Sequence, residues 1–315
     1  MRRRIAVVGS GLVGQAWAIA FARGGFDVRM HDTSPQALEA ALTGIAAVLP
    51  DLHARGLLRG KAPGDLIARI SIHSQLAAAL EQVVHVQENV PEKLEVKRAV
   101  FAELDRLAPP ETTIASSTSA LLTSAFAAGL EGQARCMVAH PLNPPHLIPV
   151  VEIVPAPFTD ADAVMRCRDI LRQAGQTTVV LAREVPGFVI NRLQGALLDE
   201  AVQLVADGVI SVEDIDIAVR DGLARRWVIM GPLETIDLNA PSGISGFIER
   251  YGPAYAEIGA ARANRVAWDG KVADELIAAR RAVLPIENLR DRQSWRDNEL
   301  ARLAAYFSKE GQDHG

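Results

Sequence analysis

The stretch that decides the fold reads Ile5-Ala6-Val7-Val8-Gly9-Ser10-Gly11-Leu12-Val13-Gly14, close to the start of a chain of 315 residues. Its β-branched run leads directly into the spacing Gly-x-Gly-x-x-Gly, and apolar residues at helical intervals follow as far as Phe21. A second strand over Asp27 to Met30 then leads to Asp32. This order of strand, glycine turn, helix, strand and acid predicts an α/β fold of the Rossmann type, with a doubly wound sheet.

Each glycine of the turn has a different task in a dinucleotide site. Gly9 permits the tight turn, Gly11 lets the backbone approach a pyrophosphate, and Gly14 lets the helix pack closely on the strand. The free N–H groups where the helix begins, at Leu12 and Val13, are expected to hold the phosphates together with the positive end of the helix dipole. These five residues are therefore candidate cofactor contacts.

Asp32 follows Gly14 by 18 residues and is placed to accept hydrogen bonds from the hydroxyls of an adenosine ribose. Its negative charge would repel a 2′-phosphate, so the sequence favours NAD over NADP as the cofactor. The alternative is a bare glycine turn, in which Asp32 only caps the helix that starts near Ser34.

Composition restricts the class of protein. With 315 residues, 49% hydrophobic and 23% charged, the chain fits a globular protein of two domains. A net charge of -5 argues against a basic nucleic-acid surface. Charged residues interrupt the apolar runs before the roughly 18 residues that a membrane span requires, and no signal peptide is recognisable. No nucleic-acid or membrane partner is therefore expected.

The two cysteines, Cys136 and Cys167, form neither a metal-ligand spacing nor a disulfide framework. They are expected to be small buried hydrophobes, and no metal site is predicted. A reducing, cytoplasmic location is the expectation that follows.

Further strands are predicted at Ala68–Ile72, Val83–Gln87 and Thr113–Ala115, and a helix is expected from Pro91 to about Leu107. Glu92 and Lys97 would lie on that helix, close to the carboxyl edge of the sheet where ligands bind.

A helix is also expected from Pro35 to Leu49, and a polar segment with Arg55, Arg59 and Lys61 follows it. These cations could contact a nucleotide such as coenzyme A, or they could belong to a solvated helical hairpin.

The stretch His140-Pro-Leu-Asn-Pro-Pro-His-Leu-Ile-Pro-Val-Val-Glu152 connects predicted strands at Arg135–Ala139 and Val150–Val154. Its prolines stiffen the loop, which can then fix the position of a side chain. An imidazole at one end and a carboxylate at the other make a plausible acid/base pair. His140 is expected to move a proton and Glu152 to orient it.

Two other positions allow two interpretations each. The hydroxyls of Ser116-Ser117-Thr118-Ser119 follow a strand, and they either satisfy one another in a turn or present one hydroxyl to a substrate. Asn191 lies just inside a largely apolar helix, where its amide is either satisfied by backbone groups or faces a ligand in a cleft between domains.

After Pro186-Gly187 the chain is almost wholly helical. Expected helices include Val189–Asp207, Ser211–Arg220, Ala254–Asn264, Gly270–Val283 and Ile286–Phe307. The predicted domains are therefore residues 1–186, which bind NAD, and residues 187–315, an all-helical domain.

Taken together, these features resemble the L-3-hydroxyacyl-CoA dehydrogenase superfamily, and within it the lambda-crystallin branch, whose enzyme activity is L-gulonate 3-dehydrogenase. The stretches that carry the resemblance are Val84–Lys97, Ala139–Glu152, Gly187–Gln194, Met230–Leu238 and Trp295-Arg296-Asp297. The resemblance implies an NAD domain followed by an all-helical dimerisation domain, and hence a homodimer.

The catalytic residues that the resemblance implies are Ser119, His140, Glu152 and Asn191. It also implies that Glu92 and Lys97 contact the nicotinamide half of NAD. One departure is visible: the acyl-CoA enzymes have an asparagine where this chain has Ser117. They also carry a lysine-rich insert, whereas here Lys61 is the only lysine before Lys93, so coenzyme A is not favoured.

The expected reaction is the NAD-dependent oxidation of the 3-hydroxyl of a small L-3-hydroxy acid, similar to L-gulonate. Ser119, Asn143 and Asn191 are candidate substrate contacts. Arg225 or Arg226 could grip the substrate carboxylate through two parallel hydrogen bonds, or both could belong to a surface helix end.

Other functions fit the same residues less well. L-carnitine dehydrogenase shares the His-Pro-x-Asn-Pro-Pro loop, but a quaternary ammonium substrate favours an aromatic cage and aromatic residues make up only 5% of the chain. L-3-hydroxyacyl-CoA dehydrogenase is a third possibility. Outside enzymes, a crystallin-like structural protein that binds NAD, or an NAD sensor, would not need the complete set of catalytic residues.

Overall fold

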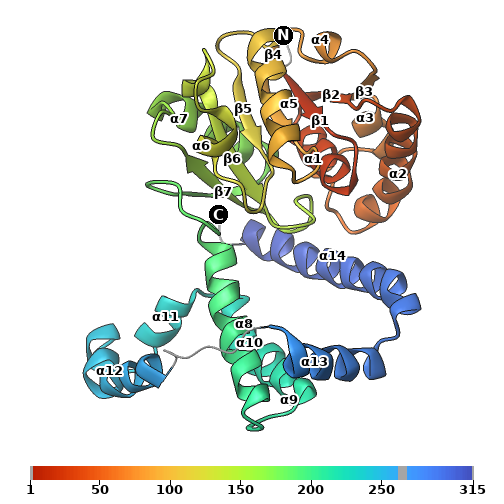
Figure 1. Cartoon of the computed structure of the whole chain (residues 1–315). Helices are drawn as coiled ribbons and strands as arrows, with labels where there is room; N and C mark the ends of the chain where they lie inside the picture. The colour runs from red at the N-terminus through yellow and green to blue at the C-terminus, as the bar shows by residue number, and fades with distance from the viewer. Residues whose placement is uncertain (1–2, 262–267, 314–315) are drawn as a thin grey trace. The chain divides into compact units, whose positions relative to one another are not determined.

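The computed structural model describes residues 3–261 and 268–313 and forms two compact units, coloured along the chain in Figure 1. The sheet unit comprises Met1–Val189 and Gln293–Gly315, and the helical unit comprises Ile190–Arg292. The division at residue 186 stays a prediction. The C-terminal segment that it assigned to the helical domain groups with the sheet unit, because Leu300, Ala301 and Ala304 pack on the sheet unit's core.

The sheet has eight strands in the order β3-β2-β1-β4-β5-β6-β7-β8. Neighbouring strands of this sheet pair in parallel, except that β6 and β7 are antiparallel to each other. The strands are β1 (Arg4–Val8), β2 (Asp27–His31), β3 (Ile70–His73), β4 (Val83–Glu88), β5 (Thr113–Ser116), β6 (Cys136–Pro141), β7 (Val150–Pro155) and β8 (Thr177–Val180). The order reverses between β1 and β4. In open α/β sheets, ligands bind at the carboxyl ends of the strands that flank such a reversal.

The helices of the sheet unit are α1 (Leu12–Arg23), α2 (Pro35–Ala54), α3 (Pro63–Ile67), α4 (Leu76–Ala79), α5 (Leu94–Leu107), α6 (Thr123–Ala127), α7 (Ala161–Ala174) and, from Gln293 on, α14 (Leu289–Asp313). They cover both faces of the sheet because the strands are apolar on both sides. Ile5 and Val7 of β1 enter one core with α1, α2 and α7, and Ala6 and Val8 enter the other core with α5 and α6. The predicted doubly wound fold is confirmed.

The boundaries of α2 and α5 differ from those expected. α2 continues beyond Leu49 to Ala54, and Ser34 caps its first turn by accepting a hydrogen bond from the Ala37 N–H. α5 begins at Leu94 rather than Pro91, because Lys93 has an extended backbone and occupies the capping position. Glu92 therefore precedes the helix on which it was expected to lie.

As expected, charge interrupts the apolar run of α2, at Glu39 and Asp51. Among the described residues, this helix alone is long and apolar enough by length and composition to cross a membrane. Its buried stripe of Leu38, Ala41, Ile45 and Leu49 packs on the core of the sheet unit, which accounts for its apolar composition.

The helical unit contains α8 (Ile190–Ala206), α9 (Val212–Ile217), α10 (Ala224–Trp227), α11 (Pro232–Asp237), α12 (Ile244–Ala261) and α13 (Gly270–Val283). A π-helical turn over Ala218–Leu223 continues α9. α12 starts well before the expected Ala254, because Pro253 lies inside the helix instead of preceding it. Residues 262–264 of that expected helix lie outside the described residues.

Candidate active site

The glycine turn has the geometry that a dinucleotide site requires. Gly9 has a φ of 93°, and a Cβ there would meet the Asn89 carbonyl oxygen at 2.7 Å. A Cβ on Gly14 would lie 2.0 Å from the Gly9 oxygen, so only glycine allows this close packing. By contrast, a Cβ on Gly11 would meet open space. The room at Gly11 and the N–H groups at the start of α1, at exposed Leu12 and at Val13, fit a pyrophosphate.

Asp32 lies half-buried beside this turn. Its Oδ2 accepts hydrogen bonds from the Ser10 N–H (2.9 Å) and the Ser10 hydroxyl (2.8 Å), and its Oδ1 accepts one from the Ser34 N–H (3.1 Å). Burial disfavours the carboxylate, but these donors outweigh burial and lower the pKa of Asp32 below its usual value. Asp32 is therefore ionised near neutral pH and can accept hydrogen bonds from ribose hydroxyls. Ser34, and not Asp32, caps α2.

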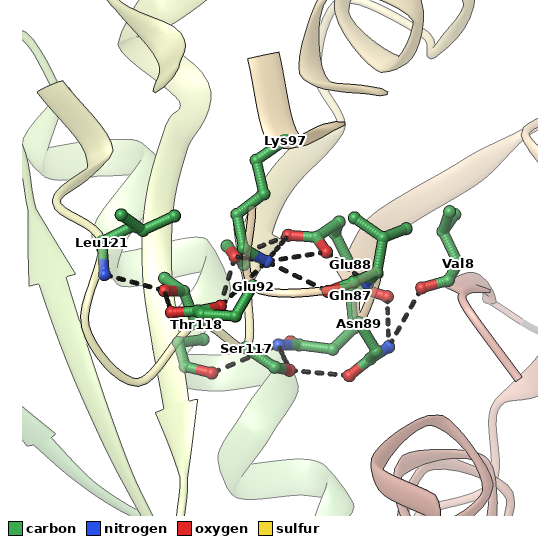
Figure 2. A network of polar contacts seen from close by, with 12 residues as sticks. Val8, Gln87, Glu88, Asn89, Glu92, Lys97, Ser117, Thr118 and Leu121 are labelled. Atoms are coloured by element: carbon green, nitrogen blue, oxygen red, sulfur yellow. Dashed lines mark hydrogen bonds and ion pairs between the residues drawn. The ribbon is translucent and has the colours of Figure 1, made fainter. Parts of the chain in front are cut away.

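A network of polar side chains joins the carboxyl ends of β1, β4 and β5 (Figure 2). The Ser117 hydroxyl donates to Asn89 Oδ1 (2.7 Å) and accepts from Gln87 Nε2 (2.7 Å) and Trp17 Nε1 (3.0 Å). Asn89 in turn donates to the Val8 carbonyl oxygen (3.4 Å). Ser117 therefore points into the protein. The departure from the resembled acyl-CoA enzymes at Ser117 therefore lies within this internal network.

Lys97 and Glu88 form a buried ion pair next to the network (Figure 2). Lys97 Nζ lies 3.0 Å from both carboxylate oxygens of Glu88, and the two side chains are 1% and 0% exposed. The Ser116 hydroxyl donates to Glu88 Oε2 (2.5 Å). Burial raises the pKa of Glu88, against the opposing charge of Lys97 and the hydroxyl of Ser116.

The sequence analysis predicted Lys97 as a site residue but missed Glu88. The sequence offered only a carboxylate directly after the predicted strand Val83–Gln87, and the contact with Lys97 depends on the fold.

Glu92 anchors the loop that follows β5 through hydrogen bonds (Figure 2). Its Oε1 accepts hydrogen bonds from the Thr118 hydroxyl and from the Ala120 N–H (3.1 Å), and its Oε2 lies 3.5 Å from Lys97 Nζ. Ser119 lies between these two anchors and is exposed. Of the hydroxyls in this cluster, Ser116, Ser117 and Thr118 bond inside the protein. The exposed position of Ser119 is compatible with its predicted contact to a substrate, which stays a prediction.

His140 and Glu152 are directly opposite one another on the antiparallel strands β6 and β7. His140 Nδ1 lies 2.8 Å from Glu152 Oε2, and the residues are 5% and 0% exposed. A buried carboxylate accepts a hydrogen bond from an N–H group, so this contact places the imidazole proton on Nδ1 and leaves Nε2 as the basic nitrogen. The structure thus brings the predicted acid/base pair together, by strand register.

Phe188 and Val189 contact this pair, and they lie in a turn that was not predicted to be part of the site. The Val189 N–H donates to Glu152 Oε1 (2.8 Å), and the ring of buried Phe188 lies 5.4 Å from the imidazole. Phe188 has a φ of 50°, in the left-handed region that non-glycine residues rarely adopt. Strained backbone of this kind is typical of functional sites. The neighbouring Pro186-Gly187 was the available signal.

Asn143 lies in the loop between β6 and β7 and is exposed. It lines a cavity of about 490 Å³ together with Leu12 and Val13 at the start of α1. Arg296 and Asp297 of α14 line the same cavity, and they pair with each other at 2.7 Å. The cavity therefore connects two predicted cofactor contacts with one predicted substrate contact.

The remaining predicted substrate residues belong to the helical unit. Asn191 lies half-buried in the first turn of α8, and Arg225 and Arg226 are exposed on α10. Their place in the site stays a prediction. Cys136 and Cys167 are buried free thiols, and burial raises each pKa to about 12. Across the described part of the chain, no group of three His, Cys, Asp or Glu side chains could hold a metal ion.

The network continues into the core through His85, which is fully buried between Thr113 (2.7 Å) and Gln87 (3.1 Å). Burial lowers its pKa from 6.5 to about 4. Because the folded pKa is depressed, the contribution of His85 to stability is complete above pH 6.5 and is lost as the pH falls toward 4. We expect the loss to reach roughly 2 kcal/mol at pH 5.

Urea unfolding at pH 7 and pH 5 tests this expectation. The variant His85→Gln should lose roughly 2 kcal/mol less than the wild type between the two pH values. Equal losses for both proteins would show that His85 does not carry this pH dependence.

Comparison with known proteins identifies the family of the chain. Residues 4–185 match the model of the 3-hydroxyacyl-CoA dehydrogenase NAD binding domain, and residues 187–275 match that of the 3-hydroxyacyl-CoA dehydrogenase C-terminal domain. The chain is 40% identical over 303 residues to lambda-crystallin of Oryctolagus cuniculus, which covers 95% of each protein. It is 36% identical over 296 residues to L-carnitine dehydrogenase of Streptomyces griseus, covering 92% of this chain and 87% of that protein.

A solved structure is similar over nearly the whole length. It is 5-formyl-3-hydroxy-2-methylpyridine 4-carboxylic acid 5-dehydrogenase, described as an NAD⁺-dependent dismutase. The TM-score is 0.80 at 29% identity, with 96% of this chain and 97% of that chain covered. The residues of the glycine turn and Asp32 fit NAD, as the family requires. The chain therefore belongs to the 3-hydroxyacyl-CoA dehydrogenase family and is an NAD-dependent dehydrogenase.

Proposed function

We propose that the protein oxidises the 3-hydroxyl of a small L-3-hydroxy acid, similar to L-gulonate, to the 3-keto acid, with His140 as the general base. The observation that carries the proposal is the buried pair of His140 and Glu152, with 2.8 Å between Nδ1 and Oε2. Such a pair fixes the tautomer of the imidazole and stabilises the imidazolium that forms during proton transfer.

In this mechanism, bound NAD supplies the acceptor for the hydride. His140 Nε2 takes the proton of the substrate hydroxyl, while the Nδ1–H group continues to donate to Glu152. The Val189 N–H holds the other oxygen of Glu152, so the carboxylate keeps its orientation as charge develops on the ring. In the reverse direction, the imidazolium returns the proton to the substrate oxygen.

Three residues are proposed to position the substrate. Ser119 and Asn191 would hold the reacting oxygen, and the exposure of Ser119 between two anchored neighbours supports its part. Asn143 would contact the rest of the molecule from the wall of the cavity. Arg225 or Arg226 would supply the counter-charge for the substrate carboxylate.

A small acid is favoured over a coenzyme A ester by the segment that follows α2. Its cations already have partners in the protein: Arg55 pairs with Asp51 at 2.8 Å, and Lys61 Nζ donates to the Arg23 carbonyl oxygen at 2.7 Å. The similarity to lambda-crystallin supports the same choice, since the L-gulonate activity is what the resemblance to that branch implies.

L-carnitine is the second candidate substrate, because one of the relatives is an L-carnitine dehydrogenase. A trimethylammonium group binds best against aromatic rings. Within the described residues, no Phe, Tyr or Trp lines the cavity beside Asn143. This observation favours the hydroxy acid over carnitine.

The function is tested by following NADH formation with L-gulonate, L-carnitine and an L-3-hydroxyacyl-CoA side by side. We expect kcat/KM to be highest for L-gulonate. A preference for either other substrate would overturn the proposed substrate class but leave the dehydrogenase mechanism in place. No turnover of any hydroxy acid would favour a crystallin-like structural role.

We also infer a cytoplasmic homodimer that assembles through the helical unit. Large apolar side chains are exposed on α8 and α12, among them Leu193 (63%), Ile248 (59%) and Tyr255 (59%). Exposed apolar side chains that gather on helices are typical of surfaces that a partner covers. The two buried free thiols are consistent with a reducing compartment.

A further inference from the structure

A second cavity, of about 520 Å³, lies in the sheet unit beneath the loop that joins β6 and β7. Its volume falls within the roughly 300–1,000 Å³ that is usual for small-molecule sites. Leu147, Leu303 and Phe307 form part of its apolar wall, and the charged side chains that line it are Arg23 and Arg59. Among the residues that the structure describes, no carboxylate lines it. The cavity is therefore apolar with a positive charge.

Arg23 is the unusual residue of this cavity. It is 7% exposed, and its Nη1 donates to the carbonyl oxygens of Leu57 (3.2 Å) and His146 (2.9 Å). Its Nε is buried without a hydrogen-bond partner, and the described residues that line the cavity beside it include no carboxylate. Burial, and then the charge of Arg59, lower the pKa of Arg23 to about 10. A buried guanidinium with an unused donor favours binding of an anion.

Neighbouring groups also favour binding of an anion in this cavity. Burial lowers the pKa of Lys61, and the charges of Arg69, Arg59 and Arg23 lower it further, which reflects a concentration of positive charge near Arg23. The guanidinium of Arg59 lies close against Gly175 at the cavity. His146 Nδ1 is a second buried atom without a partner, and His146 lines the cavity. Burial lowers its pKa to about 4, so His146 is neutral at pH 7 and can donate a hydrogen bond.

We propose that this cavity binds a small amphipathic monocarboxylate, with the carboxylate at Arg23, Arg59 and His146 and the alkyl chain along Leu147, Leu303 and Phe307. A guanidinium matches a carboxylate in shape and charge, and the burial of Arg23 strengthens its contact with an anion. The apolar wall requires a tail that is equally apolar, which a sugar phosphate or a nucleotide does not offer. His146 and Leu147 also line the cavity beside Asn143, whereas Arg23, Arg59, Leu303 and Phe307 line the second cavity and not the first. The proposal therefore rests on residues outside the proposed catalytic set.

The test is calorimetric titration of the full-length protein with octanoate, and with octanol and octylamine as matched probes. We expect octanoate to bind and the two other probes to bind at least tenfold more weakly, because they lack the negative charge. From butanoate to octanoate, each buried methylene should tighten binding roughly three- to fourfold. At an octanoate concentration 100 times its Kd, the melting temperature should rise by about 4 °C.

Variants locate the binding site. Arg59→Ala should weaken octanoate about tenfold, and Arg23→Met should abolish binding. The matched control is Arg106→Ala, which removes an arginine that is 67% exposed on α5 and should change nothing. Arg59 is exposed, so its variant keeps the fold even if Arg23→Met does not.

Four outcomes would overturn the proposal. They are no octanoate binding, equal binding of octanol, unchanged affinity in Arg59→Ala, or displacement of octanoate by saturating NADH. The last result would place octanoate in the active site instead. Retained octanoate binding in His140→Gln, with loss in Arg59→Ala, would support the separate cavity.

Discussion

Replacing His140 by glutamine is expected to lower kcat for alcohol oxidation by roughly 10²- to 10⁴-fold, with little change in NAD affinity. The amide of glutamine can still donate to Glu152, which is 0% exposed, so the buried carboxylate keeps a partner and the fold is preserved. What is lost is the basic Nε2 nitrogen. Steady-state kinetics with the best substrate of the panel, together with NAD titration, measure both effects.

Glu152→Gln tests the second member of the pair. The neutral side chain can still accept from the Val189 N–H, but its amide would donate to His140 Nδ1 and move the ring proton to Nε2. We expect a comparable loss of kcat, because Nε2 is then no longer a base. The control is His53→Gln, an exposed histidine in α2 that should retain full activity. Turnover of His140→Gln within a few fold of the wild type would refute the assignment of His140.

The parts of the site that could be predicted from the sequence are those that depend on local backbone. Position 9 requires glycine because its φ is positive, and position 14 requires glycine because the helix lies close against the Gly9 carbonyl oxygen. Both requirements follow from the spacing of the glycines in the turn. His140 and Glu152 could be paired because each ends or begins a strand beside one stiff loop. Their contact then follows from antiparallel register.

The parts that could not be predicted depend on contacts between distant segments. In the sequence, Glu88 is only a residue at the end of a buried strand. Its contact with Lys97 forms because α5 packs beside that strand. The inward orientation of Ser117 depends on Trp17, which lies in the first helix of the fold. A helical pattern predicts α14 but does not say which unit its apolar side packs on. For the same reason, the cations that follow α2 gave no indication of the cavity at Arg23.

Lys97→Met is expected to lower the free energy of unfolding by about 3–5 kcal/mol, because it leaves Glu88 as a buried charge without its counter-ion. The Ser116 hydroxyl and the Val90 N–H would remain as its hydrogen-bond donors. Loss of Lys97 raises the pKa of Glu88 further, beyond the rise that burial already causes. A carboxyl with a raised folded pKa loses stability as the pH rises through that pKa, so the deficit should be larger at pH 8 than at pH 5.

The double variant Glu88→Gln, Lys97→Met should recover most of this loss, because it removes the unpaired charge and keeps the volume of the site. Denaturant unfolding of the wild type, both single variants and the double variant at pH 5 and pH 8 completes the cycle. A deficit below about 1 kcal/mol for Lys97→Met, or no recovery in the double variant, would contradict a stabilising role of the pair. The stable double variant then isolates the role of Lys97 toward the cofactor. If Lys97 contacts the nicotinamide half of NAD, KM for NAD stays raised in the double variant although its stability is restored. If Lys97 only neutralises Glu88, KM for NAD of the double variant equals that of the wild type.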